Sequence, residues 1–312
     1  MEKEKIIIKT SLIILFSFFL LITTTYFING NLIFSQQTKY ENQIIGIKYQ
    51  EENFSELDIF GIKKIYPTKK NGFEWFMNNY DPESDPYLHN YKSIVKNKDG
   101  SYNIGERSRM SVYSKDGIGY QEGTMETYNF TELSKIGYWY KPEDWKNVEI
   151  TGEYLYKKGE GSGITHYARS EDHSTINNGC GGSSYKLKIH FDGTSSISKE
   201  QSHPKPWTIP INKNPFGKLD NDWFRFKGIM YNLPDGTVKL ENWLDPFLNN
   251  SWMKIAEYQD KGGWGEDGNK CQGNDDHIIT WGSPIVTFRW DDALVDFRNL
   301  SVREIQPYII SD

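Results

Sequence analysis

The stretch Trp223-Phe224-Arg225-Phe226-Lys227-Gly228-Ile229-Met230-Tyr231 decides the fold of this 312-residue chain. In an extended strand, successive side chains point to opposite faces of the sheet, with a period of two. The two faces would carry Phe224, Phe226 and Met230 on one side, and Arg225, Lys227 and Tyr231 on the other. An apolar face opposite a polar one predicts a half-buried β-strand.

The same texture continues through most of the chain after Leu57, in short alternating runs separated by Gly, Asn, Asp and Pro. No segment shows a sustained apolar stripe with the 3.6-residue period of a helix. Turn residues such as Asp192-Gly193 and Pro234-Asp235-Gly236 stand between the runs. We expect strands at 108–113, 148–157, 163–169, 184–192, 195–203, 223–233, 237–244, 252–259, 285–290 and 295–305. This pattern predicts one all-β sandwich or jelly roll.

The N-terminal region has the pattern of a targeting or membrane segment, which does not belong to the folded domain. Lys3, Lys5 and Lys9 precede a run from 11 to 27 that has no charge and is rich in Leu, Ile and Phe. Such a run indicates an apolar helix that serves as an export signal or an uncleaved membrane anchor. We therefore expect a signal or anchor at 1–29, a polar linker at 30–57 and the β-domain at 58–312, outside the cell or on its surface.

Cysteine usage agrees with an extracellular location. The chain has two cysteines, Cys180 and Cys271, both in Gly-rich polar segments. In an oxidising compartment an even pair favours a disulfide, and the alternative is two unpaired thiols.

The charge distribution favours an anionic ligand that is not nucleic acid. The formal net charge is -6, whereas a general nucleic-acid binder normally carries a strong positive excess. Within this acidic protein, the polar side of 223–231 is cationic, and Lys199, Gln201 and His203 share one side of the preceding strand. A basic strand face in an acidic protein suggests a bound anion.

Four pieces of sequence carry a resemblance to a known family. They are the segment 144–152, the pair Gln201-x-His203, the strand from Phe224 to Tyr231, and the closing stretch 288–305. Together they resemble the concanavalin-like jelly-roll superfamily, and within it the alginate- and glucuronan-lyase-like polysaccharide lyases. The resemblance covers roughly Leu57 to Pro307 and implies a concave sheet face, with 106–111 as the nearest match to the family's Arg-bearing strand.

The resemblance implies cleavage of a uronate-containing glycan by β-elimination. Arg109 and Gln201 would neutralise the sugar carboxylate, while His203 and Tyr231 would exchange protons with the substrate. The partner would be an acidic polysaccharide. The residues expected to bind it are Arg107, Lys188, His190, Lys199, Arg225, Lys227 and Trp243.

Several alternatives remain open at this point. The protein could be a non-catalytic, lectin-like carbohydrate-binding surface protein whose tryptophans stack on sugars. His203 precedes Pro204 and could simply end its strand, and Tyr231 could be an amphipathic rim residue. No cofactor or catalytic metal is expected. Asp275-Asp276 with Asp291-Asp292 could hold a structural Ca²⁺, or could be ordinary acidic loops.

Overall fold

The computed structural model describes residues 56–90, 92–115, 143–170, 184–201, 206–211, 216–220, 222–265 and 278–307. The chain divides into a small unit, 1–53 with 309–312, and a large unit, 54–308, which holds all the described residues. Several predictions fall outside these ranges: the N-terminal signal or anchor, nearly all of the linker, Cys180, Cys271, His203 and Asp275-Asp276. Among the described residues, no helix has the length and apolarity needed to cross a membrane.

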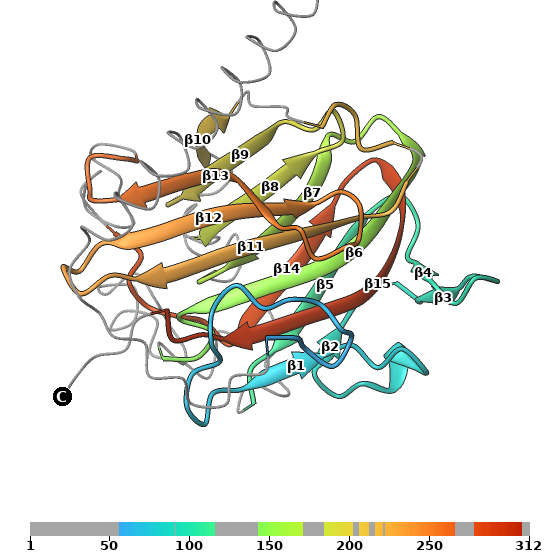
Figure 1. Cartoon of the computed structure of the whole chain (residues 1–312), viewed down its shortest axis with the longest axis horizontal. Helices are drawn as coiled ribbons and strands as arrows, with labels where there is room; N and C mark the ends of the chain where they lie inside the picture. The colour runs from blue at the N-terminus through green and yellow to red at the C-terminus, as the bar shows by residue number, and fades with distance from the viewer. Residues whose placement is uncertain are drawn as a thin grey trace, which may run out of the picture. The chain divides into compact units, whose positions relative to one another are not determined.

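The large unit consists of two antiparallel β-sheets (Figure 1). The eight-stranded sheet runs in the order β13(Met253–Asp260), β12(Val238–Asp245), β11(Phe224–Asn232), β6(Val148–Gly159), β15(Ala293–Glu304), β4(Tyr102–Asn103) and β3(Val95–Lys96), and β1(Glu74–Phe76) also pairs with β15. The seven-stranded sheet runs in the order β10(Pro206–Ile211), β9(Ser195–Glu200), β8(Ser184–His190), β7(Gly163–Ala168), β14(Ile285–Trp290), β5(Ser108–Tyr113) and β2(Leu88–His89). A single 3-10 turn, η1(Pro82–Ser84), is the only helical element in the described part.

The prediction of an all-β jelly-roll sandwich is confirmed. All ten predicted strands are present, and β5 and β14 have the bounds that the sequence predicts. The sequence did not predict β1 to β4 or β10. Four of these are only two or three residues long, too short for an alternating pattern to be recognised.

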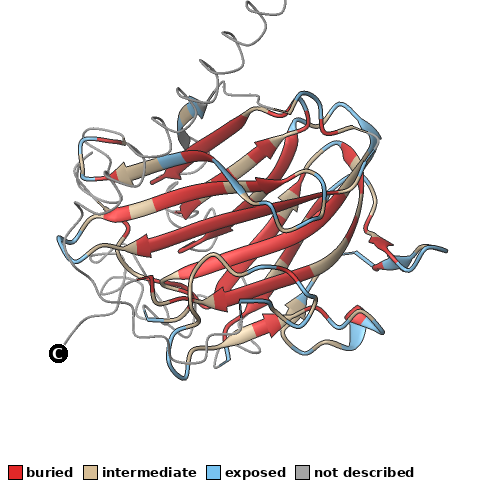
Figure 2. Ribbon diagram, in the orientation of Figure 1, coloured by how far each residue is buried: buried red, intermediate tan, exposed pale blue. Residues whose placement is uncertain are grey.

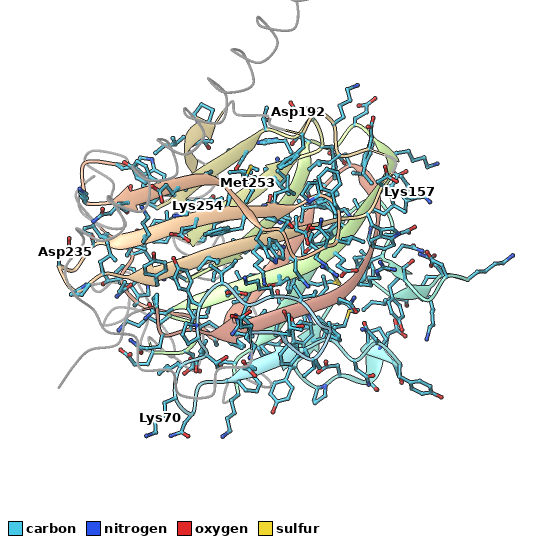
Figure 3. All side chains as sticks on the ribbon, viewed as in Figure 1. Lys70, Lys157, Asp192, Asp235, Met253 and Lys254 are labelled. Carbon is cyan, nitrogen blue, oxygen red and sulfur yellow. The ribbon has the colours of Figure 1, made fainter. Side chains whose placement is uncertain are left out.

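The core lies between the two sheets, because each strand turns its apolar side inward. Phe226 and Met230 of the eight-stranded sheet belong to the same buried cluster as Leu187, Ile189 and Phe288 of the seven-stranded sheet. Figure 2 shows the strands of both sheets buried over most of their length and the connecting loops exposed. Charged residues of those loops and strand ends, such as Lys70, Lys157, Asp192 and Asp235, lie at the rim (Figure 3).

The segment 56–67, which we call the strap, lies against part of the outer face of the eight-stranded sheet. The backbone N–H groups of Ile65 and Tyr66 in the strap donate to Glu149 Oε2 on β6, at 3.1 and 3.3 Å. A bridge between Thr68 and Ile305 fixes the chain just after the strap. In Figure 1 this N-terminal part of the domain, in blue, crosses over β6 and β15.

Candidate functional site

The cationic side of β11 is not an open surface, contrary to the sequence prediction. Lys227 is 1% exposed, and its Nζ lies 2.6 Å from Glu149 Oε1 and 2.9 Å from Thr151 Oγ1. Arg225 Nε donates to Glu153 Oε1 at 2.7 Å. Each cation is thus neutralised by a carboxylate on β6 and buried, so neither is placed to bind a ligand from solvent.

Tyr231 and Trp243 lie on the same outer face of the eight-stranded sheet, where Trp243 packs against the cluster that contains Tyr231. The Tyr231 hydroxyl donates to Glu241 Oε1 at 3.2 Å and lies 3.2 Å from the Tyr66 hydroxyl of the strap. Trp243 Nε1 donates to Glu241 Oε2 at 2.8 Å, and Lys254 Nζ lies 5.4 Å from the centre of the Trp243 ring. Figure 3 shows Lys254 at the start of β13, at the edge of this sheet.

Lys199 and Gln201 point into the sandwich instead of lining a surface. Lys199 is fully buried, and its Nζ lies 2.9 Å from Asp260 Oδ2 on the other sheet. Gln201 is 1% exposed and packs against Gly265, where an added Cβ would lie 2.0 Å from Gln201 Oε1. The inward side of β9 also carries Ile197, an apolar residue of the same parity that could have signalled this orientation.

The three predicted catalytic residues that the structure describes are therefore not brought together. Arg109 is on the outer face of the seven-stranded sheet, Gln201 is inside the sandwich, and Tyr231 is on the outer face of the other sheet. His203 lies outside the described residues. Tyr231 and Arg109 thus lie on the outer faces of different sheets and do not share one site.

A different set of the predicted residues does share one surface, the outer face of the seven-stranded sheet. Met110, Val112, Leu187, Ile189 and Phe288 of this sheet point into the core, so their strand neighbours point outward. The cross-strand register aligns these outward residues in two rows. One row is Arg109, Arg289, Thr165, Lys188 and Ser196, and the other is His89, Ser111, Thr287, Tyr167, Lys186, Ser198 and Thr208.

Arginines gather at the β5 and β14 end of this surface. Arg109 and Arg289 are directly opposite each other in the register. Asp291 in the turn after β14 is shared by three guanidinium groups, with Oδ2 2.7 Å from Arg289 Nε, and Oδ1 3.2 Å from Arg107 Nε and 3.6 Å from Arg109 Nη2. Although burial acts in the opposite direction, the hydrogen bond from Arg289 and the charges of Arg289, Arg109 and Arg107 lower the pKa of Asp291. Asp291 thus supplies one negative charge to three guanidinium groups, which leaves the cluster with a net positive charge.

Two lysines of β8 extend the positive charge along the sheet. Lys186 forms an ion pair with Glu200 and lies with its Nζ 5.9 Å from the centre of the Tyr167 ring. Burial, and then the charges of Arg289 and Arg109, lower the pKa of Lys186 to about 7. Burial and Arg289 likewise lower the pKa of Lys188. The two lysines are therefore close enough to the arginines for their positive charges to repel one another. We call the surface that carries Arg107, Arg109, Lys186, Lys188 and Arg289 the cationic face.

Hydrogen-bonding groups without charge fill the rest of the cationic face. Lys188 Nζ donates to Ser162 Oγ at 2.5 Å, and His190 Nε2 lies 3.0 Å from Ser196 Oγ. Burial and the charge of Lys188 lower the pKa of His190. Hydroxyl pairs link neighbouring strands, Ser198 with Thr208 at 2.9 Å and Ser111 with Thr287 at 3.2 Å. The face is therefore polar from β5 to β10.

The predicted Ca²⁺ ligands do not form a site in the part of the chain that the structure describes. The Asp291 carboxylate is engaged by arginines, and no group of three or more His, Cys, Asp or Glu side chains suited to a metal ion is found among the described residues. Asp275 and Asp276 lie outside those residues.

Arg289 is the functional candidate that sequence reasoning missed. The signal was present, because Phe288-Arg289-Trp290 alternates within the predicted strand 285–290. What the sequence could not provide was the pairing of β14 with β5, which sets Arg289 against Arg109 across more than 170 residues.

Comparisons with known proteins gave a structural likeness only. No family model matches the sequence, and no curated protein matches it. A protein of unknown function with a galectin-like fold from Bacillus subtilis has a TM-score of 0.41 at 10% identity, covering 77% of this chain and 98% of its own. The exoplasmic/lumenal domain of VIP36, bound to Ca²⁺ and Man3GlcNAc, has a TM-score of 0.38 at 8% identity, covering 73% of this chain and 90% of its own. An endo-β-1,4-glucuronan lyase from Trichoderma reesei has a TM-score of 0.35 at 11% identity, covering 82% and 96%.

By their names, these neighbours are a domain bound to Man3GlcNAc, a galectin-like protein and a glucuronan lyase. Their scores and identities are too low to transfer a ligand or an activity to this chain.

Proposed function

We propose that the protein binds an acidic polysaccharide outside the cell, across the cationic face. The observation that carries the proposal is the direct opposition of Arg109 and Arg289, with Lys188 in the same row and Lys186 in the next. Like charges directly opposite each other in a sheet destabilise it. An anion bound between them would relieve this repulsion and gain charge-assisted hydrogen bonds.

The charge balance of the face supports an anionic ligand. The five cations of the face are paired with only two carboxylates, Glu200 and Asp291, whereas the whole chain has a net charge of -6. A local positive surface on an acidic protein concentrates anionic ligands while the protein as a whole remains soluble.

The extent of the face supports a polymer over a small anion. Seven strands spaced by about 4.8 Å make a surface roughly 29 Å wide from β10 to β2. The cations lie on β8, on β14 and on or just before β5, and Thr208 on β10 adds an exposed hydroxyl group, whereas Ser196 and Ser198 on β9 are buried. A glycan chain that presents carboxylates and hydroxyl groups along its length would satisfy both parts of such a surface.

Binding is proposed here ahead of cleavage. β-Elimination requires a base and an acid at the scissile bond, and Tyr231, which was expected to take part, is on the other sheet. The lyase activity suggested by the sequence therefore stays a separate question, which one assay answers. When the protein is incubated with alginate, glucuronan or pectin, it should bind the polymer. The ultraviolet absorbance that an unsaturated product gives should not rise.

Direct binding tests the proposal. We expect the purified chain to bind alginate, glucuronan or pectin at least tenfold more tightly than neutral dextran, with an affinity that falls as salt is raised. The double variant Arg109→Gln/Arg289→Gln should lose this preference. Equal binding to dextran, or unchanged binding by the double variant, would contradict the proposed function.

A further inference from the structure

The Lys199–Asp260 pair joins the two layers of the sandwich at a fully buried position. Lys199 belongs to β9 of the seven-stranded sheet and Asp260 ends β13 of the eight-stranded sheet. Both side chains have 0% exposure, and Nζ lies 2.9 Å from Oδ2. Around them are the aromatic rings of Tyr185, which is fully buried, and Trp264, whose ring centre is 5.7 Å from Nζ.

The other contacts of Asp260 polarise its carboxyl group for attack by an amine. The Tyr185 hydroxyl donates to Oδ2 at 2.5 Å, and the Gly262 N–H donates to Oδ1 at 3.0 Å. Tyr185 is held in place because its hydroxyl also accepts the Ile279 N–H at 3.1 Å. Burial, and then the negative charge of Asp260, raise the pKa of Tyr185, so the phenol keeps its proton and acts as a donor.

We infer that Lys199 and Asp260 condense, without any other protein, into an amide that cross-links the two sheets. In the buried ion pair the ammonium first returns one proton to the carboxylate, because a low-dielectric interior disfavours separated charges. The neutral amine then forms the Nζ–Cγ bond, while the Gly262 N–H stabilises the charge that develops on Oδ1. The Cγ–Oδ2 bond breaks, Oδ2 leaves as water with the proton supplied through Tyr185, and the amine proton restores the phenol. No atom is oxidised or reduced.

Two physical effects favour the amide at this place. The reacting atoms are held in contact by the two sheets, and such intramolecular placement is equivalent to roughly 10⁵–10⁸ M of a free reactant. The pair is also sealed from solvent, so bulk water does not reach the amide to hydrolyse it.

The same molecule contains a matched pair that should not condense. Lys227 Nζ lies 2.6 Å from Glu149 Oε1, and both side chains are as deeply buried as Lys199 and Asp260. Glu149, however, also receives Arg303 Nη2 at 2.8 Å and two strap N–H groups. Although burial opposes it, the charges of Arg303 and Lys227 lower the pKa of Glu149 to about 2. An ionised carboxylate is a poor acceptor for an amine, so this pair remains a salt bridge.

Mass spectrometry tests the inference on the full-length wild-type chain. After reduction, alkylation and proteolysis, the peptides that contain Lys199 and Asp260 should appear as one branched species, lighter than their sum by one water molecule. The peptides that contain Lys227 and Glu149 should appear separately. Recovery of the Lys199 and Asp260 peptides as two linear species at their sequence masses would overturn the inference.

Three variants check the chemistry of the step. Asp260→Asn should give the same branched product with loss of ammonia in place of water, whereas Asp260→Ala should give none. Tyr185→Phe keeps the ring but removes the proton donor, so the linked fraction at a fixed time after synthesis should fall severalfold. A branched species that persists in Asp260→Ala would show that a different carboxyl group is used and would contradict the assignment.

Discussion

Replacing Arg109 with glutamine separates the effect of the cationic face on folding stability from its effect on ligand binding. In the free protein, Arg109 Nη2 is 3.6 Å from Asp291 Oδ1, and the side chain is 27% exposed. Such a pair contributes under about 1 kcal/mol to folding. The repulsion from Arg289 directly opposite opposes folding by a similar amount, roughly 0.2–1 kcal/mol. Asp291 keeps Arg107 and Arg289 as partners, so the free energy of unfolding should change by less than about 1 kcal/mol in either direction.

Binding should respond much more strongly than folding. A hydrogen bond between Arg109 and a sugar carboxylate would contribute about 1.5–3 kcal/mol, which corresponds to a loss of affinity of roughly 10- to 150-fold in Arg109→Gln. Titration calorimetry with alginate at fixed salt measures the affinity, and urea unfolding measures the stability of the free variant.

Lys70→Gln is the matched control for this variant. It removes the same charge from an exposed residue near the strap, away from the cationic face. Its affinity for alginate should stay within about twofold of the wild type, because exposed charges far from the ligand are largely screened by salt. Equal losses in the two variants would refute the reasoning, since they would show that net charge alone governs binding. Destabilisation of Arg109→Gln by several kcal/mol would refute it too, because Arg109 would then be a structural residue.

Three further predictions follow from individual residues. Affinity for alginate should fall as pH rises from about 6 to 9, because Lys186, with a pKa of about 7, loses its charge; Lys186→Arg should flatten this dependence, and a flat wild-type profile would contradict the role of Lys186. Lys227→Met should lower the free energy of unfolding by about 3–5 kcal/mol in urea titrations, since it leaves Glu149 buried beside fewer cations; a loss below about 1 kcal/mol would show that the pair is dispensable. Gly282→Ala should cost at least about 2 kcal/mol by the same assay, because its Cβ would lie 1.8 Å from the Asp144 carbonyl oxygen; wild-type stability would contradict this packing.

The strands of this protein could be predicted from sequence because the alternation that defines them is local. Phe224, Phe226 and Met230 point inward as their spacing indicates, and the bounds of β5 and β14 follow from the residues that flank them. The same alternation cannot tell an open polar face from a covered one. Lys227 and Arg109 have equivalent patterns in their own strands, yet one is buried and the other lies on the cationic face.

The difference arises from parts of the chain that are distant in sequence. Lys227 is buried beside Glu149 and the Trp252 ring, and Glu149 is in turn bound by the strap, which lies more than 150 residues before β11. Arg109 acquires its significance from Arg289, which only the pairing of β5 with β14 places opposite it. The inward orientation of Lys199 could have been predicted from the sequence, because Ile197, two residues earlier, lies on the same side of β9 and is apolar.

Protection of lysines from chemical acetylation tests the central claim most directly. Lys188 lies on the cationic face, whereas Lys70, Lys157 and Lys254 lie elsewhere on the domain (Figure 3). With saturating alginate, the acetylation rate of Lys188 should fall at least tenfold, while the rates of the other three lysines stay within about twofold. Protection of Lys254 in place of Lys188, or equal protection of all four, would contradict binding of an acidic polysaccharide across the seven-stranded sheet.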